Sequence, residues 1–361
     1  MAKSLLFIPD ISGYTKFIQT TEVEHSQHVI SELLEILISA NTEDLKLAEI
    51  EGDALFFYKE GEIPSQERLL AQIEAMFTAF HSHLALLKKN RICPCNACAT
   101  APDLELKIIA HSGELQHIEV QGNRKPFGQQ VIEAHRLLKN SVQSDNYVLV
   151  SRSLAMEIQL SYTYSSKLFR FRQGADSYDE KNVDYLYSII DSTQLTLNSF
   201  ESPKKVSFNR IPDLTVQKEF SISAERLLEY ITNYTYRGKW VNGVDSFDFN
   251  ENEVTRHGTE HVCVVNGKNF DFVTVTKDVD ENKIVYGEMT ESPPPLDKLY
   301  QFYIITVINE KSCELLIEVY WEAKSLIKKM IMALFVKNTF KKNTNDAISN
   351  LSKFIHEIEN A

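Results

Sequence analysis

The sequence predicts an α+β protein of two domains, and three observations support this prediction. The chain has 361 residues, which exceeds one ordinary domain and falls short of three. Apolar residues make up 43% of it and charged residues 24%, which is enough apolar material for two cores. A polar stretch without periodicity, at 191–212, separates two regions of strands and helices. We therefore expect domains at 1–190 and 213–361, joined by this linker.

Short apolar strands and amphipathic helices alternate in the first region. The predicted strands lie at 4–11, at 45–58, at 147–151 and at 185–190, with two further strands around His111-Ser112-Gly113. The predicted helices lie around 29–38, over 65–89 and after Gly128, where apolar residues recur at helical spacing. A hairpin turn is favoured at Gly52-Asp53, within the second strand region. This order is typical of an α+β sandwich with helices on one face of the sheet.

The second region contains a run of strands followed by one long helix. Strands are predicted at 213–221, 257–265, 269–278, 283–290, 299–308 and 312–322. Helices are predicted at 222–233 and from about Ala323 to Glu359. Strands wrapped around one terminal helix indicate a second α+β domain.

Charge and hydropathy exclude several classes of protein. The 50 acidic and 38 basic residues give a net charge of −12, which repels nucleic acid backbones, so no nucleic acid partner is expected. The N-terminus has too few apolar residues for a signal peptide, and no stretch approaches the roughly 20 apolar residues of a membrane span. A cytoplasmic protein without a transmembrane segment is expected, in which the five cysteines are thiols or metal ligands.

Two aspartates are candidate metal ligands in the first domain. Asp10 ends an apolar strand, and Asp53 lies in the predicted hairpin turn, which could lie beside it. Two carboxylates at strand ends form an oxygen site suited to Mg²⁺ or Mn²⁺. The alternative is that Asp53 is an ordinary turn residue.

Four motifs occur in the same order and spacing as in one known family. They are FIPDISGYT at 7–15, the turn at 49–53, LKIIAHSGEL at 106–115, and PFGQQVIEAHRLLK at 126–139 followed by YVLVS. Together they resemble the class III adenylate/guanylate cyclase homology domain, over about residues 4–155. The resemblance implies a ferredoxin-like fold for the first domain.

The resemblance also implies a two-metal reaction. Asp10 and Asp53, with the Ile11 carbonyl as a further ligand, would hold two Mg²⁺ or Mn²⁺ ions. The ions bind a nucleoside triphosphate, whose 3′-hydroxyl attacks the α-phosphate to give a cyclic nucleotide and pyrophosphate, which is phosphorus-oxygen lyase chemistry. Such active sites form across a head-to-tail homodimer, so the residues that recognise the base and stabilise the transition state come from the partner subunit.

The other positions of the family pattern agree less well. Glu49 matches the base-reading glutamate of guanylate cyclases, whereas Lys125, the second base-binding position, fits neither nucleotide, so the base stays open. Arg136 matches the arginine that stabilises the transition state, although it could instead be a helix-surface cation. The asparagine that orients the ribose is replaced by Ile132, which cannot form a hydrogen bond. Glu133 or His135 could replace its function.

A cysteine-rich insertion occupies residues 91–100. Cys93, Cys95 and Cys98 could bind Zn²⁺ as a structural metal, with His81, His83 or a residue of a second subunit as the fourth ligand. A reduced, partly buried cysteine loop is an equal alternative. An iron–sulfur cluster is less favoured because no fourth cysteine lies nearby.

The second domain resembles START-like helix-grip proteins over about 213–358. The resemblance rests on FSISAERLLEYI at 220–231, YRGKWVNGV at 236–244 and the long closing helix. It implies an apolar small molecule or lipid as ligand. We predict no catalytic constellation here, and His257 and His261, without a nearby acid, are predicted to be surface or satisfied residues.

Two functions from different classes follow. The first is a nucleotidyl cyclase that takes part in signalling and is regulated by a ligand of the START-like domain. The alternative is a catalytically silent cyclase-fold module that binds a nucleotide or partner, which Ile132 and Lys125 favour. A third and weaker possibility makes the second domain the enzyme.

Overall fold

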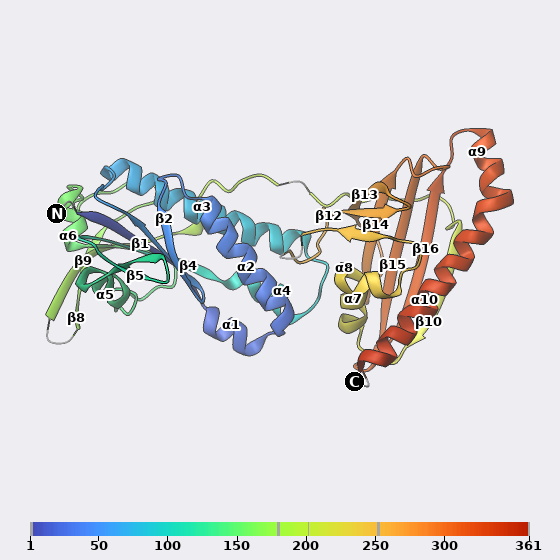
Figure 1. Cartoon of the computed structure of the whole chain (residues 1–361), viewed down its shortest axis with the longest axis horizontal. Helices are drawn as coiled ribbons and strands as arrows, with labels where there is room; N and C mark the ends of the chain where they lie inside the picture. Colours follow the sequence, from blue (N-terminus) through green and yellow to red (C-terminus); the bar gives the residue numbers. More distant parts are fainter. Residues whose placement is uncertain (1–2, 179–180, 201, 251–252, 360–361) are drawn as a thin grey trace. The chain divides into compact units, whose positions relative to one another are not determined.

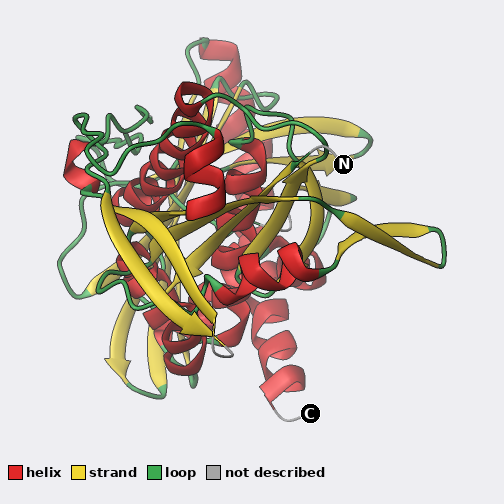
Figure 2. Ribbon diagram, turned by 90° about the vertical axis from the view of Figure 1, so that its left-hand side faces the viewer, coloured by secondary structure: helices red, strands yellow, loops and turns green. Residues whose placement is uncertain are grey.

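A computed structural model describes residues 3–178, 181–200, 202–250 and 253–359. Helices and β-sheets are both abundant, which confirms the predicted α+β class (Figure 2). The chain divides into two compact units, the first made of Met1–Lys88 and Asn96–Phe200 and the second of Lys89–Cys95 and Glu201–Ala361. Each unit is described by itself.

A seven-stranded sheet organises the first unit. In sheet order its strands are β2 (Lys46–Glu51), β3 (Ala54–Lys59), β1 (Ser4–Ser12), β4 (Glu105–Gly113), β7 (Tyr147–Ser151), β9 (Lys181–Ile189) and β8 (Arg172–Tyr178). All neighbours are antiparallel except β4 and β7, which run parallel. A separate hairpin pairs β5 (Gln116–Val120) with β6 (Asn123–Phe127). The two central strands, β1 and β4, carry mostly buried residues.

The helices of the first unit include two long ones that match the apolar periodicity. They are α1 (Tyr14–Thr20), α2 (Val23–Ser39), α3 (Gln66–Asn90), α4 (Asn96–Thr100), α5 (Gln129–Arg136) and α6 (Arg152–Glu157), with 3-10 turns η1 (Ala101–Asp103) and η2 (Ser192–Gln194). The short helices α1, α4 and α6 were not predicted. The two strands predicted around His111-Ser112-Gly113 correspond to β4 and β5. Strands β6 and β8 were missed, since their polar sequences lack an apolar alternation.

Both faces of β1 are covered, which corrects the prediction of helices on one face only. Leu5 and Leu6 point to opposite faces of the sheet, and both are fully buried. Leu6 and Ile8 share a core cluster with Ala134 of α5, so α5 covers their face. Because side chains alternate along a strand, Asp10 projects from this same face.

The second unit contains a seven-stranded antiparallel sheet. In sheet order its strands are β10 (Leu214–Phe220), β16 (Ser312–Glu322), β15 (Lys298–Asn309), β14 (Lys283–Glu291), β13 (Lys268–Val275), β12 (Glu260–Val265) and β11 (Ser246–Asp248). The strand predicted at 257–265 begins three residues later, so His257 precedes it. Five of the six predicted strands match observed ones closely, and only the short β11 was missed.

Two helices lie between β10 and β11 in the chain, and one long helical segment ends this unit. The connecting helices are α7 (Ala224–Thr232) and α8 (Tyr234–Trp240). The closing segment consists of α9 (Leu326–Ile331), the π-helical turn η3 (Met332–Val336) and α10 (Lys337–Glu359), and it contacts β10 and α8 (Figure 1). The single predicted helix is thus interrupted by a π-helical turn.

Candidate functional site

Backbone pairing brings the two predicted metal carboxylates next to each other. Asp10 on β1 is paired with Ala54 on β3, and Asp53 directly precedes Ala54. The backbone N–H of Ile11 donates a hydrogen bond to the Asp53 carbonyl over 3.1 Å. The β2–β3 turn is therefore held against the end of β1, as the predicted hairpin requires.

The acid pair, defined as Asp10 and Asp53, holds two partly buried negative charges. Burial and the nearby charge of Asp10 raise the pKa of Asp53 to about 6, and burial also raises the pKa of Asp10. Burial thus makes it costly to ionise either carboxylate, and the charge of Asp10 adds to this cost for Asp53. Oxygen donors that repel each other in this way fit a divalent cation such as Mg²⁺ or Mn²⁺, with the Ile11 carbonyl on the same strand.

A lysine beside the acid pair was not predicted. Lys107 on β4 is the direct cross-strand partner of Asp10, and its Nζ lies 3.4 Å from Asp10 Oδ1. Its charge lowers the pKa of both aspartates and so offsets part of their repulsion. A cation that binds Asp10 has to compete with this ammonium group.

The two predicted base-binding residues contact each other. Lys125 Nζ on β6 donates a hydrogen bond to Glu49 Oε1 on β2 over 2.9 Å. Both side chains are close to half exposed, at 47% and 43%, so water screens this ion pair and it contributes little to stability. The pair can therefore open at low cost when another group binds either residue.

Helix α5 carries the remaining predicted residues. It begins after Gly128, whose φ of 111° strongly favours glycine, and it contacts β1 and β4. Arg136 lies half-buried in its last turn, whereas Ile132 is 53% exposed. His135 Nδ1 lies 3.4 Å from Glu51 Oε2 in the β2–β3 hairpin. The helix thus lies on the sheet face from which Asp10 projects.

The cysteine-rich insertion contains a short helix and a histidine-cysteine cluster. Ligand atoms of Cys93, Cys95, Cys98 and His25 all lie within 4.8 Å of one another, and no disulfide joins the cysteines. The proposed ligands His81 and His83 are wrong. His81 Nε2 contacts Asn146 Oδ1 at 3.2 Å, and His83 Nε2 contacts Glu32 Oε2 at 2.7 Å.

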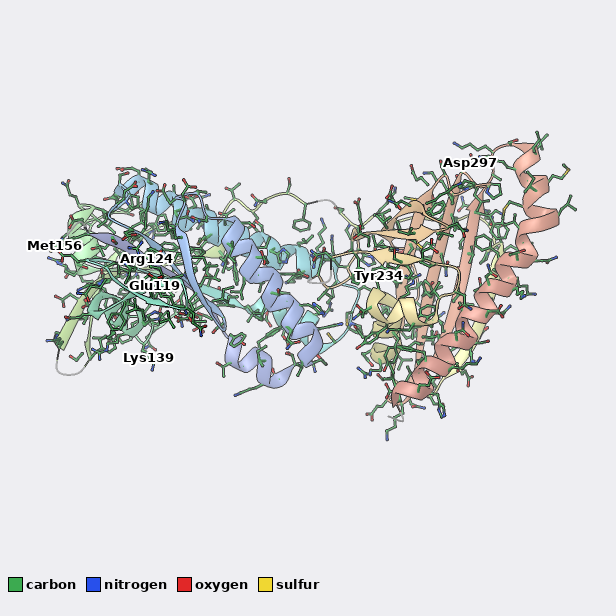
Figure 3. All side chains as sticks on the ribbon, in the orientation of Figure 1. Glu119, Arg124, Lys139, Met156, Tyr234 and Asp297 are labelled. Atoms are coloured by element: carbon green, nitrogen blue, oxygen red, sulfur yellow. The ribbon has the colours of Figure 1, made fainter. Side chains whose placement is uncertain are left out.

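The second unit contains a buried charged cluster that the sequence did not indicate. Arg237 and Glu288 form a two-bond ion pair, with Arg237 Nη2 2.6 Å from Glu288 Oε2, and both side chains are at most 6% exposed. Three buried hydroxyls add further hydrogen bonds, those of Tyr234 (labelled in Figure 3), Tyr286 and Tyr303. We call these five residues the buried ion-pair cluster.

His261 contacts this cluster, which corrects the statement that no acid lies near it. Its Nδ1 lies 2.7 Å from the Tyr234 hydroxyl and its Nε2 3.5 Å from Glu288 Oε1. The side chain is 2% exposed, so burial lowers its pKa to about 4. It is a buried, hydrogen-bonded residue of the core.

This lowered pKa predicts that the second unit loses stability in acid. In the unfolded chain, histidine binds a proton below about pH 6.5, whereas folded His261 stays neutral to about pH 4. The contribution of neutral His261 to the free energy of unfolding is complete above pH 6.5 and is lost as the pH falls to 4. At about 1.4 kcal/mol per pH unit, the loss amounts to about 3 kcal/mol. Urea unfolding followed by tryptophan fluorescence measures it, since Trp240 and Trp321 are the chain's two tryptophans.

His261→Gln is the control for this measurement, because other acidic groups also titrate near pH 4. Between pH 7 and pH 4 the variant should lose about 3 kcal/mol less than the wild type. Equal losses in both proteins would contradict the assignment.

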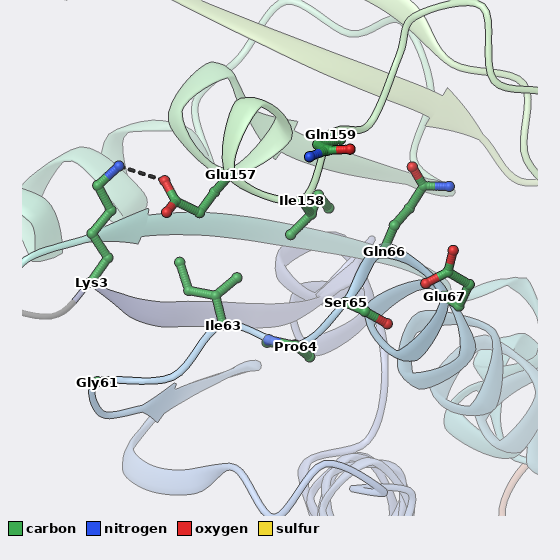
Figure 4. A pocket seen from close by; sticks show the side chains of 10 residues that line it. All are labelled: Lys3, Gly61, Ile63, Pro64, Ser65, Gln66, Glu67, Glu157, Ile158 and Gln159. Carbon is green, nitrogen blue, oxygen red and sulfur yellow. Dashed lines mark hydrogen bonds and ion pairs between the residues drawn. The ribbon is translucent and has the colours of Figure 1, made fainter.

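A surface cleft of about 820 Å³ lies elsewhere on the first unit, between the start of α3 and the end of α6 (Figure 4). Lys3 and Glu157 form an ion pair of 2.5 Å at its edge, and Ser65 and Gln66 line it. No predicted site residue lines this cleft.

Comparison by sequence finds a family of unknown function and one uncharacterized relative. The family described as "Protein of unknown function (DUF2652)" matches residues 30–147. The uncharacterized protein Rv2561/Rv2562 of Mycobacterium tuberculosis is 33% identical over 126 residues, which is 35% of this chain. The chain spans 58% of that relative's length.

Comparison by structure finds cyclase catalytic domains at low identity. The catalytic core of a rhodopsin-guanylyl cyclase with converted specificity, in complex with ATPαS, has a TM-score of 0.39 and 14% identity, covering 52% of this chain and 96% of its own. The adenylyl cyclase CyaB from P. aeruginosa has a TM-score of 0.37 and 17% identity, covering 52% and 94%. Within the described part of this chain, no helix is both long and apolar enough to span a membrane.

Proposed function

We propose that the first unit is a nucleotidyl cyclase that converts a nucleoside triphosphate to a cyclic nucleotide and pyrophosphate. The juxtaposition of Asp10 and Asp53, with pKa values raised by burial, is the observation that carries this proposal. We further propose that the protein acts in the cytoplasm as a homodimer.

Each residue has a distinct task in the proposed reaction. Asp10, Asp53 and the Ile11 carbonyl would hold Mg²⁺ or Mn²⁺, which supplies charge neutralisation of the triphosphate and activation of the ribose hydroxyl. Arg136, always charged, would stabilise negative charge on the phosphates across the dimer. Glu49 would accept hydrogen bonds from the base once its ion pair with Lys125 opens.

A second candidate is a catalytically silent module that binds a nucleotide. Two observations favour it: Ile132 is exposed where the cyclase pattern has a ribose-orienting asparagine, and Lys107 already offsets the charge of Asp10. Poor orientation of the ribose lowers the rate without preventing binding.

For the second unit we propose a START-like domain, from about residue 213 to the end of the chain, that binds an apolar small molecule or lipid. Its antiparallel seven-stranded sheet and long closing helix support this proposal. Such a ligand would regulate the first unit.

The full-length protein, incubated with Mn²⁺ and each of the four nucleoside triphosphates in turn, tests the proposal by mass spectrometry of the products. We expect one cyclic nucleotide together with pyrophosphate. Nucleotide binding without a cyclic product from any of the four would support the silent module and overturn the cyclase proposal.

A further inference from the structure

The histidine-cysteine cluster has dimensions close to those of a tetrahedral metal site. His25 Nδ1 lies 3.6 Å from Cys98 Sγ, and the four ligand atoms all lie within 4.8 Å of one another. With Zn–S bonds of about 2.3 Å and Zn–N bonds of about 2.1 Å, ligand atoms around one zinc ion are roughly 3.6–3.8 Å apart. A contraction of about 1 Å at most would enclose an ion.

The fold brings His25 to the cysteines through the start of α2. The Glu22 carboxylate, just before α2, accepts hydrogen bonds from the backbone N–H groups of Asn96 and Ala97, over 3.3 and 3.0 Å. These bonds hold the first turn of α2, which carries His25, against α4, which carries Cys98. The fourth ligand therefore comes from a residue 68 positions before the first cysteine, which local sequence spacing could not indicate.

The cysteines are buried in a way that suits bound thiolates. Cys93, Cys95 and Cys98 are only 6–8% exposed, and the backbone N–H of Cys95 donates to Cys93 Sγ over 3.5 Å. Buried thiolates are costly without a cation, and a bound metal ion removes that cost. Three sulfurs and one imidazole nitrogen are the donors that zinc prefers in closed sites.

We propose that His25, Cys93, Cys95 and Cys98 bind one zinc ion in a closed, four-coordinate structural site. All four coordination positions are filled by protein, so the ion has no open position for a substrate. The site stabilises the turn between α3 and α4. It is independent of the nucleotide chemistry proposed above.

The test measures metal content and ligand geometry in the purified full-length protein. Mass spectrometry of the metals should find about one zinc per chain, and exchange with Co²⁺ should produce the strong visible absorption of tetrahedral cobalt with thiolate ligands. His25→Ala should weaken zinc binding by at least about 100-fold, because removing a residue that only hydrogen-bonds to a metal ligand already lowers metal affinity by about 10–100-fold. His25→Cys should restore binding, and His28→Ala, on the same helix, should leave it unchanged.

Three results would overturn the proposal. The first is protein purified with zinc present and under reducing conditions that holds no zinc. The second is a Cys95–Cys98 disulfide found in that protein by alkylation and mass spectrometry, which would indicate a redox pair. The third is an unchanged cobalt spectrum in His25→Ala, which would exclude His25 as the fourth ligand. Circular dichroism of each variant shows whether the fold is kept, and so separates loss of a ligand from loss of the fold.

Discussion

Replacement of Asp53 by asparagine should reduce cyclic nucleotide formation by about 1000-fold while leaving the first unit folded. The amide keeps the shape of the side chain but removes one of the two charges in the acid pair, so about 4 kcal/mol of transition-state stabilisation is lost. Because burial and the nearby charge of Asp10 both disfavour an ionised Asp53, as its raised pKa indicates, the free energy of unfolding should stay the same or rise. Initial rates with Mn²⁺ and the preferred triphosphate, together with circular dichroism, measure both effects.

Glu51→Gln is the matched control for this experiment. It removes a carboxylate from the same hairpin, one that faces His135 rather than Asp10. Binding of Mn²⁺ to each variant, measured by calorimetry without nucleotide, gives a second readout and should weaken only in Asp53→Asn. Full activity in Asp53→Asn would show that the acid pair is not the metal site.

The hairpin turn that carries Asp53 is local and could be predicted from the residues themselves, whereas its place beside Asp10, 43 positions earlier, was implied by the resemblance to the cyclase domain. A hairpin turn at Gly52-Asp53 places Asp53 at the end of a strand, and strand pairing then sets it beside Asp10. The α+β class and the long helices α2 and α3 follow from apolar periodicity in the same way. The turn and the helices depend on residues a few positions apart, whereas the pairing of β1 with β3 joins distant parts of the chain.

The contacts that could not be predicted depend on tertiary register. Lys107 lies opposite Asp10 only because β1 and β4 pair in one particular register, although 97 positions separate them in the sequence. Lys125 and Glu49, 76 residues apart, meet because the β5–β6 hairpin lies close to β2. In the sequence, each of these side chains is indistinguishable from an ordinary surface charge. Its role becomes visible only when the structure shows which charged residue it contacts.

The buried ion-pair cluster shows the same limit in the second unit. Arg237 comes from α8, Glu288 from β14 and Tyr303 from β15, and the sheet brings all three together. The sequence analysis assigned no role to Arg237 or Glu288. Charged residues are rarely fully buried without a partner, and here each residue is the partner of the other.

Removal of one member of this ion pair should strongly destabilise the second unit. Arg237→Met leaves Glu288 buried without its cation, and Glu288→Gln leaves Arg237 without its anion, so each should lower the free energy of unfolding by about 3–5 kcal/mol. The double variant Arg237→Met/Glu288→Gln leaves no unpaired charge and should lose less than the two single losses added together. Urea unfolding at pH 7, followed by the fluorescence of Trp240 and Trp321, measures all three.

A surface ion pair in the same unit provides the control for these variants. Arg226 and Glu359 are 46% and 37% exposed, so Arg226→Met should cost no more than about 1 kcal/mol. Strict additivity of the Arg237 and Glu288 losses would contradict direct coupling between the two buried charges. A double variant as stable as the wild type would instead mean that the ion pair contributes little net stability, and that its role is to fix the positions of α8, β14 and β15 around the tyrosine hydroxyls.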